Sequence, residues 1–108
     1  MMDFKLPAIC CALFVLAAPT AVQAAGDPAA GRKKAETCLG CHGIEDYKNV
    51  YPTYHVPKLG GQNAEYIVAA LAAYSSGERP HSTMHAQAAT LSAEDMQDIA
   101  AYFAAQGQ

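Results

Sequence analysis

The sequence predicts an all-α domain whose helices are joined by long, ordered loops. Three observations lead to this fold class. No stretch alternates apolar and polar residues in the way that a half-buried strand does. Two segments repeat apolar residues at helical spacing behind residues that favour a helix N-cap, and a third consists of good helix formers. Proline and glycine punctuate the segment between the first two helices, where the helical periodicity disappears.

The size and charge of the chain limit what the domain can be. The chain has 108 residues and a formal net charge of −3, so we expect one domain at most. This weakly acidic balance gives no basic surface for nucleic acid, and no nucleic-acid partner is predicted. A domain this small buries only about 60% of the surface that its unfolded chain exposes. We therefore expect a covalent staple or an apolar cofactor to stabilise it.

The N-terminal segment has the organisation of an export signal. Lys5 precedes a nearly continuous apolar run over Leu6–Ala18, and residues 22–24 supply the small side chains at which a signal peptidase cleaves. We predict cleavage after these residues, so that residues 1–24 are a removed signal peptide and residues 25–108 the mature domain. Export then predicts a periplasmic location.

An uncleaved membrane anchor is the alternative interpretation of this segment. A spanning helix needs an uninterrupted apolar run of about 20 residues, and Pro7, Pro19 and Gln23 interrupt this one. Cys10 and Cys11 lie inside the run and are expected to leave with the signal. The mature chain then keeps two cysteines and has no membrane span.

The first helix of the mature domain is expected to begin at Asp27, a favoured N-cap. Pro28 suits the first helical position, and good helix formers continue over Ala29–Thr37, up to Cys38. A glycine inside an exposed helix costs about 1 kcal/mol relative to alanine. We interpret Gly31 as a position where another backbone or ring packs closely.

Between residues 43 and 62 we expect an ordered loop. The segment is polar, contains tyrosines and is punctuated by Pro52, Pro57, Gly60 and Gly61. A loop of this length in so small a domain usually wraps something.

A second helix is predicted to follow its N-cap, Asn63, and to end at residues 75–77. One side of it should be buried, because it repeats apolar and aromatic residues at helical spacing: Tyr66, Ile67, Ala70, Leu71 and Tyr74. Another irregular stretch is expected over residues 78–91. The last helix opens at Ser92, where Asp95 completes a Ser-x-x-Asp capping pattern. Its apolar face is formed by Met96, Ile99, Ala100 and Phe103.

Residues 38–42 form C-x-x-C-H, the pattern of covalent haem attachment. In this pattern Cys38 and Cys41 hold the haem covalently and the imidazole of His42 holds its iron. Other uses of a Cys-x-x-Cys pair fit less well. No βαβ context activates a thioredoxin-like pair, and no second ligand pair completes a zinc site. A disulfide across two residues adds little stability and leaves His42 unexplained. We predict one covalently bound haem c.

The whole mature region also resembles the class I cytochromes c. It is similar in particular to a single domain of the small periplasmic bacterial cytochromes, including those that fuse two such domains. The resemblance is carried by Gly-Asp-Pro-Ala-Ala-Gly at 26–31, Cys-Leu-Gly-Cys-His-Gly at 38–43, Pro-Lys-Leu-Gly-Gly-Gln at 57–62, Gly-Glu-Arg at 77–79 with Met84, and residues 91–103. It implies the cytochrome c fold, with three main helices and long loops wrapping one haem.

The resemblance also implies roles for single residues. Cys38 and Cys41 add across the haem vinyl groups, and His42 is the proximal iron ligand. A ligating imidazole is normally oriented by a hydrogen bond from its other nitrogen, and by analogy the acceptor is the Pro57 carbonyl. Leu59 is expected to pack on the haem face.

Two methionines are candidates for the sixth ligand of the iron. A neutral thioether raises the haem potential and suits an electron carrier. Met96 shares helical spacing with the apolar face of the last helix, so core packing explains it better. Met84 lies in an irregular segment, where the family places its axial methionine, and is the predicted ligand. His81 or His85 is the alternative, which would lower the potential.

The family also pairs a glycine of the first helix with an aromatic ring of the last. Here these are Gly31 and Tyr102. Ala35 departs from the pattern, since many relatives carry an aromatic residue there, so the crossing is expected either to be less tightly filled or to be compensated by Phe103. A set of loop tyrosines has no fixed counterpart in the family and is assigned to packing, with a haem propionate edge as the alternative: Tyr47, Tyr51 and Tyr54.

The predicted function is that of a secreted electron carrier with a single haem and no catalytic residues. Because His42 and Met84 would fill both axial positions, small-ligand chemistry should be slow, which argues against an oxygen-activating or peroxide-reducing enzyme. The expected partners are a donor and an acceptor protein that the sequence does not identify. Two alternatives are the electron-accepting haem subunit of a larger periplasmic oxidoreductase and a haem sensor with a labile sixth site.

Overall fold

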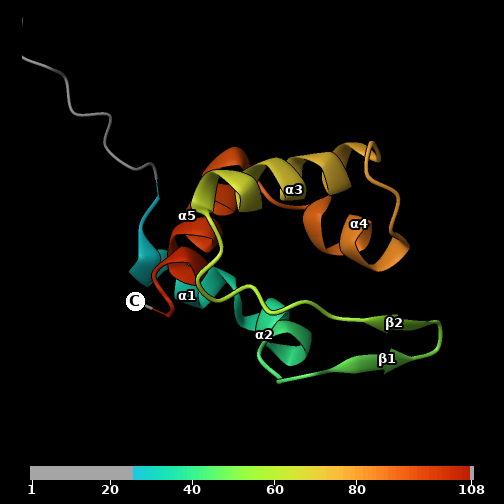
Figure 1. Ribbon diagram of the computed structural model, residues 1–108. Helices are drawn as coiled ribbons and strands as arrows, with labels where there is room; N and C mark the ends of the chain where they lie inside the picture. The colour runs from blue at the N-terminus through green and yellow to red at the C-terminus, as the bar shows by residue number, and fades with distance from the viewer. Residues whose placement is uncertain (1–25, 108) are drawn as a thin grey trace, which may run out of the picture.

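The computed structural model describes residues 26–107, so the predicted signal peptide lies outside the described residues. Within this range the elements follow in the order α1 (Pro28–Lys34), α2 (Glu36–His42), β1 (Lys48–Val50), β2 (Thr53–His55), α3 (Ala64–Ser76), α4 (Ser82–Ala88) and α5 (Ala93–Ala104). In Figure 1, α1 crosses α5 at one end, while α3 and α4 face α2 and the hairpin across the rest of the molecule. The predicted helical fold class is confirmed.

The hydrophobic core lies where α5 packs between α1 and α3. It is small, and its larger members come mainly from α3 and α5: Ala35, Ile67, Leu71, Ala88, Met96, Ile99, Ala100 and Phe103. Met96 is 8% exposed and belongs to this core, as its helical spacing predicts. None of the helices within residues 26–107 combines the length and the apolar character needed to cross a bilayer.

The crossing of α1 and α5 depends on Gly31. A Cβ atom added there would overlap the backbone oxygen of Asp98 and lie 2.9 Å from Cβ of Tyr102. The predicted close packing at this glycine is confirmed. The nearest neighbour is the backbone of Asp98, and the Tyr102 side chain comes next. Asp27 caps α1 as expected, because its carboxylate accepts a hydrogen bond from the Ala29 amide at 2.9 Å.

The prediction of one continuous first helix up to Cys38 is wrong. The helix breaks at the fully buried Ala35, whose φ and ψ are −87° and 5°, and a second helix, α2, starts at Glu36 and carries both cysteines. No helix-breaking residue marks this point in the sequence. Tertiary packing of Ala35 into the core overrides local helix propensity there.

The long segment after α2 contains a small antiparallel hairpin, although no strand was expected. Its register pairs Lys48 with His55 and Val50 with Thr53. Two side-chain hydrogen bonds of 2.8 Å fasten the turn, from Asn49 to the Pro52 carbonyl and from Thr53 to the Val50 carbonyl. Strands of three residues are too short to show an alternating pattern, which explains the missed prediction.

Helices α3 and α5 are the elements that the sequence predicts best. Asn63 caps α3, and Ser92 and Asp95 form a complete capping box on α5. On α3, Ile67 and Leu71 are buried as predicted, whereas Tyr66 is 54% exposed. The segment predicted as irregular, residues 78–91, contains the two-turn helix α4, whose N-cap is His81 rather than one of the usual capping residues.

Candidate cofactor site

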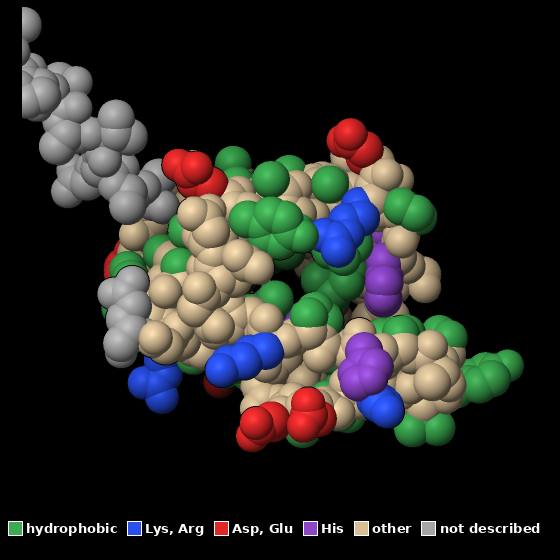
Figure 2. All heavy atoms as spheres, viewed as in Figure 1, with side chains coloured by type: hydrophobic (Ala, Val, Ile, Leu, Met, Phe, Trp, Pro, Cys, Tyr) green, Lys and Arg blue, Asp and Glu red, His purple; other side chains and the backbone are tan. Residues whose placement is uncertain are grey.

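A cavity of about 550 Å³ lies between the side of the molecule formed by α2 and β2 and the side formed by α3 and α4. Figure 2 shows it as a hollow in the middle of the molecular face. Its lining comes from all four of these elements and from the segments between them, and includes Cys38, Cys41, His42, Tyr54, His55, Pro57, Lys58, Leu59, Gln62, Tyr66, Ile67, Tyr74, Arg79, His81, Thr83 and Met84. The volume falls within the range typical of cofactor pockets.

Both cysteines of the C-x-x-C-H motif lie on α2 and line this cavity. Cys38 and Cys41 are three residues apart, so they lie on one face of the helix. Both are half-buried and neither forms a disulfide. Burial raises the pKa of the Cys38 thiol. The two sulfur atoms are therefore available for thioether bonds to one group inside the cavity.

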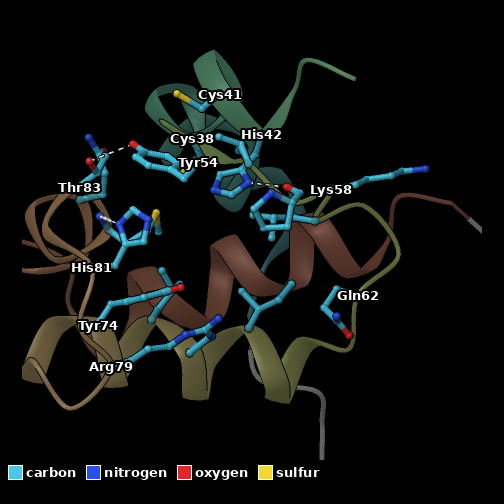
Figure 3. Close-up of a pocket in the computed structure, with 18 of the residues that line it drawn as sticks. Cys38, Cys41, His42, Tyr54, Lys58, Gln62, Tyr74, Arg79, His81 and Thr83 are labelled. Atoms are coloured by element: carbon cyan, nitrogen blue, oxygen red, sulfur yellow. Dashed lines mark hydrogen bonds between the residues drawn. The ribbon is translucent and has the colours of Figure 1, made fainter. Parts of the chain in front are cut away.

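The imidazole of His42 is oriented by a backbone carbonyl. Its Nδ1 lies 2.7 Å from the carbonyl oxygen of Pro57, and Figure 3 shows this bond at the cavity wall. A carbonyl only accepts hydrogen bonds, so Nδ1 carries the proton and donates it. The lone pair of the neutral ring is then on Nε2, the nitrogen that remains free to bind a metal.

Met84 reaches the same cavity from α4, on the side away from α2. It is half-buried and packs beside the core. Met96 is not among the lining residues, so Met84 is the methionine that the structure brings to the cavity within residues 26–107. Leu59 also lines the cavity, from the segment between β2 and α3.

The histidines that the sequence offers as alternatives have different surroundings. His81 lines the cavity, but its Nδ1 accepts a hydrogen bond from the Met84 amide at 3.3 Å. His85 is exposed and donates from Nδ1 to the Tyr74 carbonyl at 2.8 Å; it is not among the lining residues. His55, which the sequence does not offer as a ligand, lies on β2 and is an exposed part of the lining.

Several polar residues beside the predicted ligands also line the cavity. The hydroxyl of Tyr54 donates to the hydroxyl of Thr83 at 3.0 Å, and the guanidinium of Arg79 stacks over the ring of Tyr74 at 4.6 Å. Lys58 adds a second cationic side chain to the lining. Tyr54 is one of the loop tyrosines to which the sequence assigns packing or a haem propionate edge, and Tyr74 lies in the predicted helix α3. Lys58, Arg79 and Thr83 lie in segments expected to be irregular, where no periodic pattern assigns a role to a side chain.

Comparison with known proteins gives one family for almost the whole described region. The family model described as Cytochrome c matches residues 28–106. The chain is 44% identical over 85 residues to "Cytochrome c-554(548)" of Halomonas halodenitrificans, a match that covers 76% of this chain and 99% of that protein.

Longer relatives match as well. "Cytochrome c4" of Pseudomonas aeruginosa is 40% identical over 84 residues, which is 78% of this chain and 40% of that protein. "Cytochrome c4" of Thiocapsa roseopersicina is 40% identical over 82 residues, 75% of this chain and 41% of that protein. The chain thus spans less than half the length of these relatives.

Proposed function

The chain belongs to the cytochrome c family, and we propose that it carries single electrons in the periplasm through a haem whose iron is bound by His42 and Met84. Membership of the family makes it an electron-transfer protein with covalently bound haem c. The observation that carries the finer proposal is the arrangement of Cys38, Cys41, His42 and Met84 around one cavity.

The residues around the cavity fit a haem in chemistry as well as in volume. In our proposal each thiol of Cys38 and Cys41 adds across one vinyl group, so that two thioether bonds fix the cofactor to α2. The apolar side chains of Leu59, Ile67 and Leu71 would contact the ring, since they line the cavity. The lining also includes two cationic side chains, Lys58 and Arg79, which would pair with carboxylates at the edge of the ring.

The proposed axial ligands suit a carrier. When bound, the haem supplies an iron that cycles between the ferrous and ferric states. The hydrogen bond to Pro57 holds the imidazole of His42 in one tautomer and raises its basicity as a ligand. As a ligand, the neutral thioether of Met84 would favour the reduced state and raise the potential. With His42 and Met84 both holding the iron, exogenous ligands would bind slowly, which would favour electron transfer over chemistry on a bound substrate.

The substitution Met84→Leu tests the ligand assignment. The oxidised holoprotein should show the weak sulfur-to-iron charge-transfer band, and the variant should lose it. Its reduction potential should fall by on the order of 0.1 V, within the span of about 0.8 V that axial ligands control. The measurements are an absorption spectrum of the oxidised protein and a redox titration.

Met96→Leu is the matched control for that substitution. Met96 is 8% exposed in the core and does not line the cavity, so a volume-conserving change there should keep the band and cost less than about 1.5 kcal/mol of stability. If Met84→Leu keeps both the band and the potential of the wild type, Met84 is not the ligand.

Two further measurements test the proposal that the protein is a periplasmic electron carrier. An intact mass of the exported protein should equal residues 25–108 plus one haem, because we propose that residues 1–24 are removed. Transient electron-transfer contacts are small and weak, so the protein should purify alone at high salt. Stable co-purification with a catalytic partner would instead support the alternative role as the haem subunit of a larger oxidoreductase.

A further inference from the structure

Met84 lies in a helix that is too short to be stable by itself. Helix α4 has seven residues, Ser82–Ala88, and its one buried residue is Ala88, at the C-terminal end. Isolated helices shorter than about 12–15 residues are marginal in water. The position of the Met84 backbone therefore depends on contacts that other parts of the chain make with α4, at its first turn as well as at Ala88 and His85.

One such contact is the helix cap. His81 precedes α4 with extended backbone, and its Nδ1 accepts a hydrogen bond from the amide of Met84 at 3.3 Å. Nδ1 uses its lone pair in this bond, so the neutral ring carries its proton on Nε2. The cap is thus made directly to the backbone of the proposed iron ligand.

The imidazole of His81 is itself held between two tyrosine rings. The Tyr54 ring meets it edge to face, with centroids 4.8 Å apart and an interplanar angle of 78°. The Tyr74 ring does so from α3, at 6.1 Å and 76°. Offset and edge-to-face aromatic pairs with centroids 4.5–7 Å apart are favourable. His81 is therefore fixed from both the hairpin and α3.

A second contact reaches the first turn of α4 from across the cavity. The hydroxyl of Tyr54, on β2, donates to the hydroxyl of Thr83 at 3.0 Å. Figure 3 shows Tyr54, Thr83 and His81 gathered at one edge of the cavity. Strand β2 follows His42 in the chain by little more than ten residues, and Thr83 directly precedes Met84. The bond between Tyr54 and Thr83 therefore connects the segment after one proposed ligand, His42, to the residue before the other, Met84.

We propose that His81 and Tyr54 are positioning residues that hold Met84 on the iron, His81 by capping α4 at the Met84 amide and Tyr54 by bridging from β2 to Thr83 and supporting the His81 ring. The proposal rests on the proposed ligation by Met84. Its consequence is that these two residues control how often the sixth position opens. A role in folding alone would leave the sixth position unchanged.

Imidazole added to the oxidised holoprotein measures this opening, because it binds only where the methionine has left. Its apparent dissociation constant equals the intrinsic constant divided by the fraction of open molecules. His81→Ala removes the cap and should tighten imidazole binding about fivefold, which corresponds to ~1 kcal/mol, the usual contribution of a helix cap. The charge-transfer band should weaken in parallel. His81→Asn keeps a good capping residue and should restore most of the wild-type behaviour.

Tyr54→Phe keeps the ring against His81 and removes only the bond to Thr83. It should tighten imidazole binding about threefold, less than loss of the cap because Thr83 is exposed to water. Thr83→Val should have a similar effect. The double variant should be no worse than either single change, since both remove the same bond.

Ser92→Ala is the matched control. It removes the cap of α5, a helix that contributes no residue to the lining of the cavity. It should lower the thermal stability about as much as His81→Ala does, with imidazole affinity and the band at wild-type values. If His81→Ala and Tyr54→Phe behave like Ser92→Ala, the positioning role is wrong. If wild type itself lacks the band, or Met84→Leu retains it, the ligand assignment has failed instead.

Discussion

Lys34 joins the first helix to the last through two carboxylates. Its ammonium lies 2.8 Å from Asp95 and 2.7 Å from Asp98. Asp98 is 5% exposed and also accepts a hydrogen bond from the Asp27 amide at 2.7 Å, so its second oxygen is satisfied as well. This arrangement follows the rule that a buried charge needs a partner. It fixes the end of α1 to α5 and thereby helps to place α2, which follows directly.

The stability of the protein should fall on acidification as these carboxylates lose their charge. The hydrogen bond from Lys34 lowers the pKa of Asp95 to about 2, and the same partner lowers the pKa of Asp98. Groups with a depressed pKa contribute stability above their unfolded value of about 3.9, and this contribution disappears as the pH falls through the folded value. We expect the thermal midpoint of the holoprotein to drop between about pH 4 and pH 2.

The variant Lys34→Met separates this effect from the other groups that titrate in the same range. This variant should be less stable than the wild type at neutral pH. Its stability should also fall less than that of the wild type between about pH 4 and pH 2, because the pKa values of its Asp95 and Asp98 lie nearer their ordinary values. Lys33→Met, at an exposed position of the same helix, should follow the wild-type curve. Equal slopes for Lys34→Met and wild type would contradict the assignment of acid sensitivity to this cluster.

The packing of α1 on α5 leads to a second prediction. In Gly31→Ala the new methyl group would overlap the backbone oxygen of Asp98, and a backbone atom cannot move aside without shifting a helix. We expect a loss of about 2 kcal/mol in the free energy of unfolding, typical of overpacking. Denaturant titration of the holoprotein measures this loss.

Gly60→Ala provides the comparison for that substitution. The nearest atoms to a Cβ at Gly60 belong to the side chain of Gln106, at 3.3 Å, which can rotate away. We expect a change of no more than about 0.5 kcal/mol. If both alanine variants unfold at the same denaturant concentration, the close approach of α1 and α5 is not what makes Gly31 necessary.

The accuracy of the sequence predictions follows the size of each element and the clarity of its signals. Helices α3 and α5 have capping residues and two or more turns of apolar periodicity, and both lie where predicted. Helix α4 has one buried residue and a histidine cap, so neither signal was present. The break at Ala35 arises from burial of that residue in the core, which depends on the whole fold and leaves no local trace.

At the scale of the whole molecule, the C-x-x-C-H motif and the family resemblance indicated the cofactor, and the family comparison confirms haem c. The roles of Pro57, Leu59 and Met84 stay predictions, now with a shared cavity in their favour. Contacts such as that between Tyr54 and Thr83 could not be predicted, because residues 29 positions apart meet only when the hairpin folds over α4.

The cavity divides the molecule in a way that makes the fold depend on the haem. The apolar core lies around α5, whereas α2, the hairpin and α4 face one another across about 550 Å³. Side chains that line such an opening lack packing partners on the cavity side. A typical domain has only about 5–15 kcal/mol of total stability, so losing these contacts matters.

We therefore expect the protein without haem to lose most of its helical structure. The double variant Cys38→Ala/Cys41→Ala, freed of any non-covalently bound haem by extraction, should show a weak far-ultraviolet circular dichroism signal and no cooperative thermal transition. Met84→Leu is the control, since both thiols remain to hold the haem and the helical signal should stay close to that of the wild type. A cooperative transition with full helical signal in the double variant would mean that the core around α5 folds the chain unaided. The expected result is the opposite, because the described part of the chain holds only eight buried apolar residues, too few to order two facing layers without an apolar ring between them.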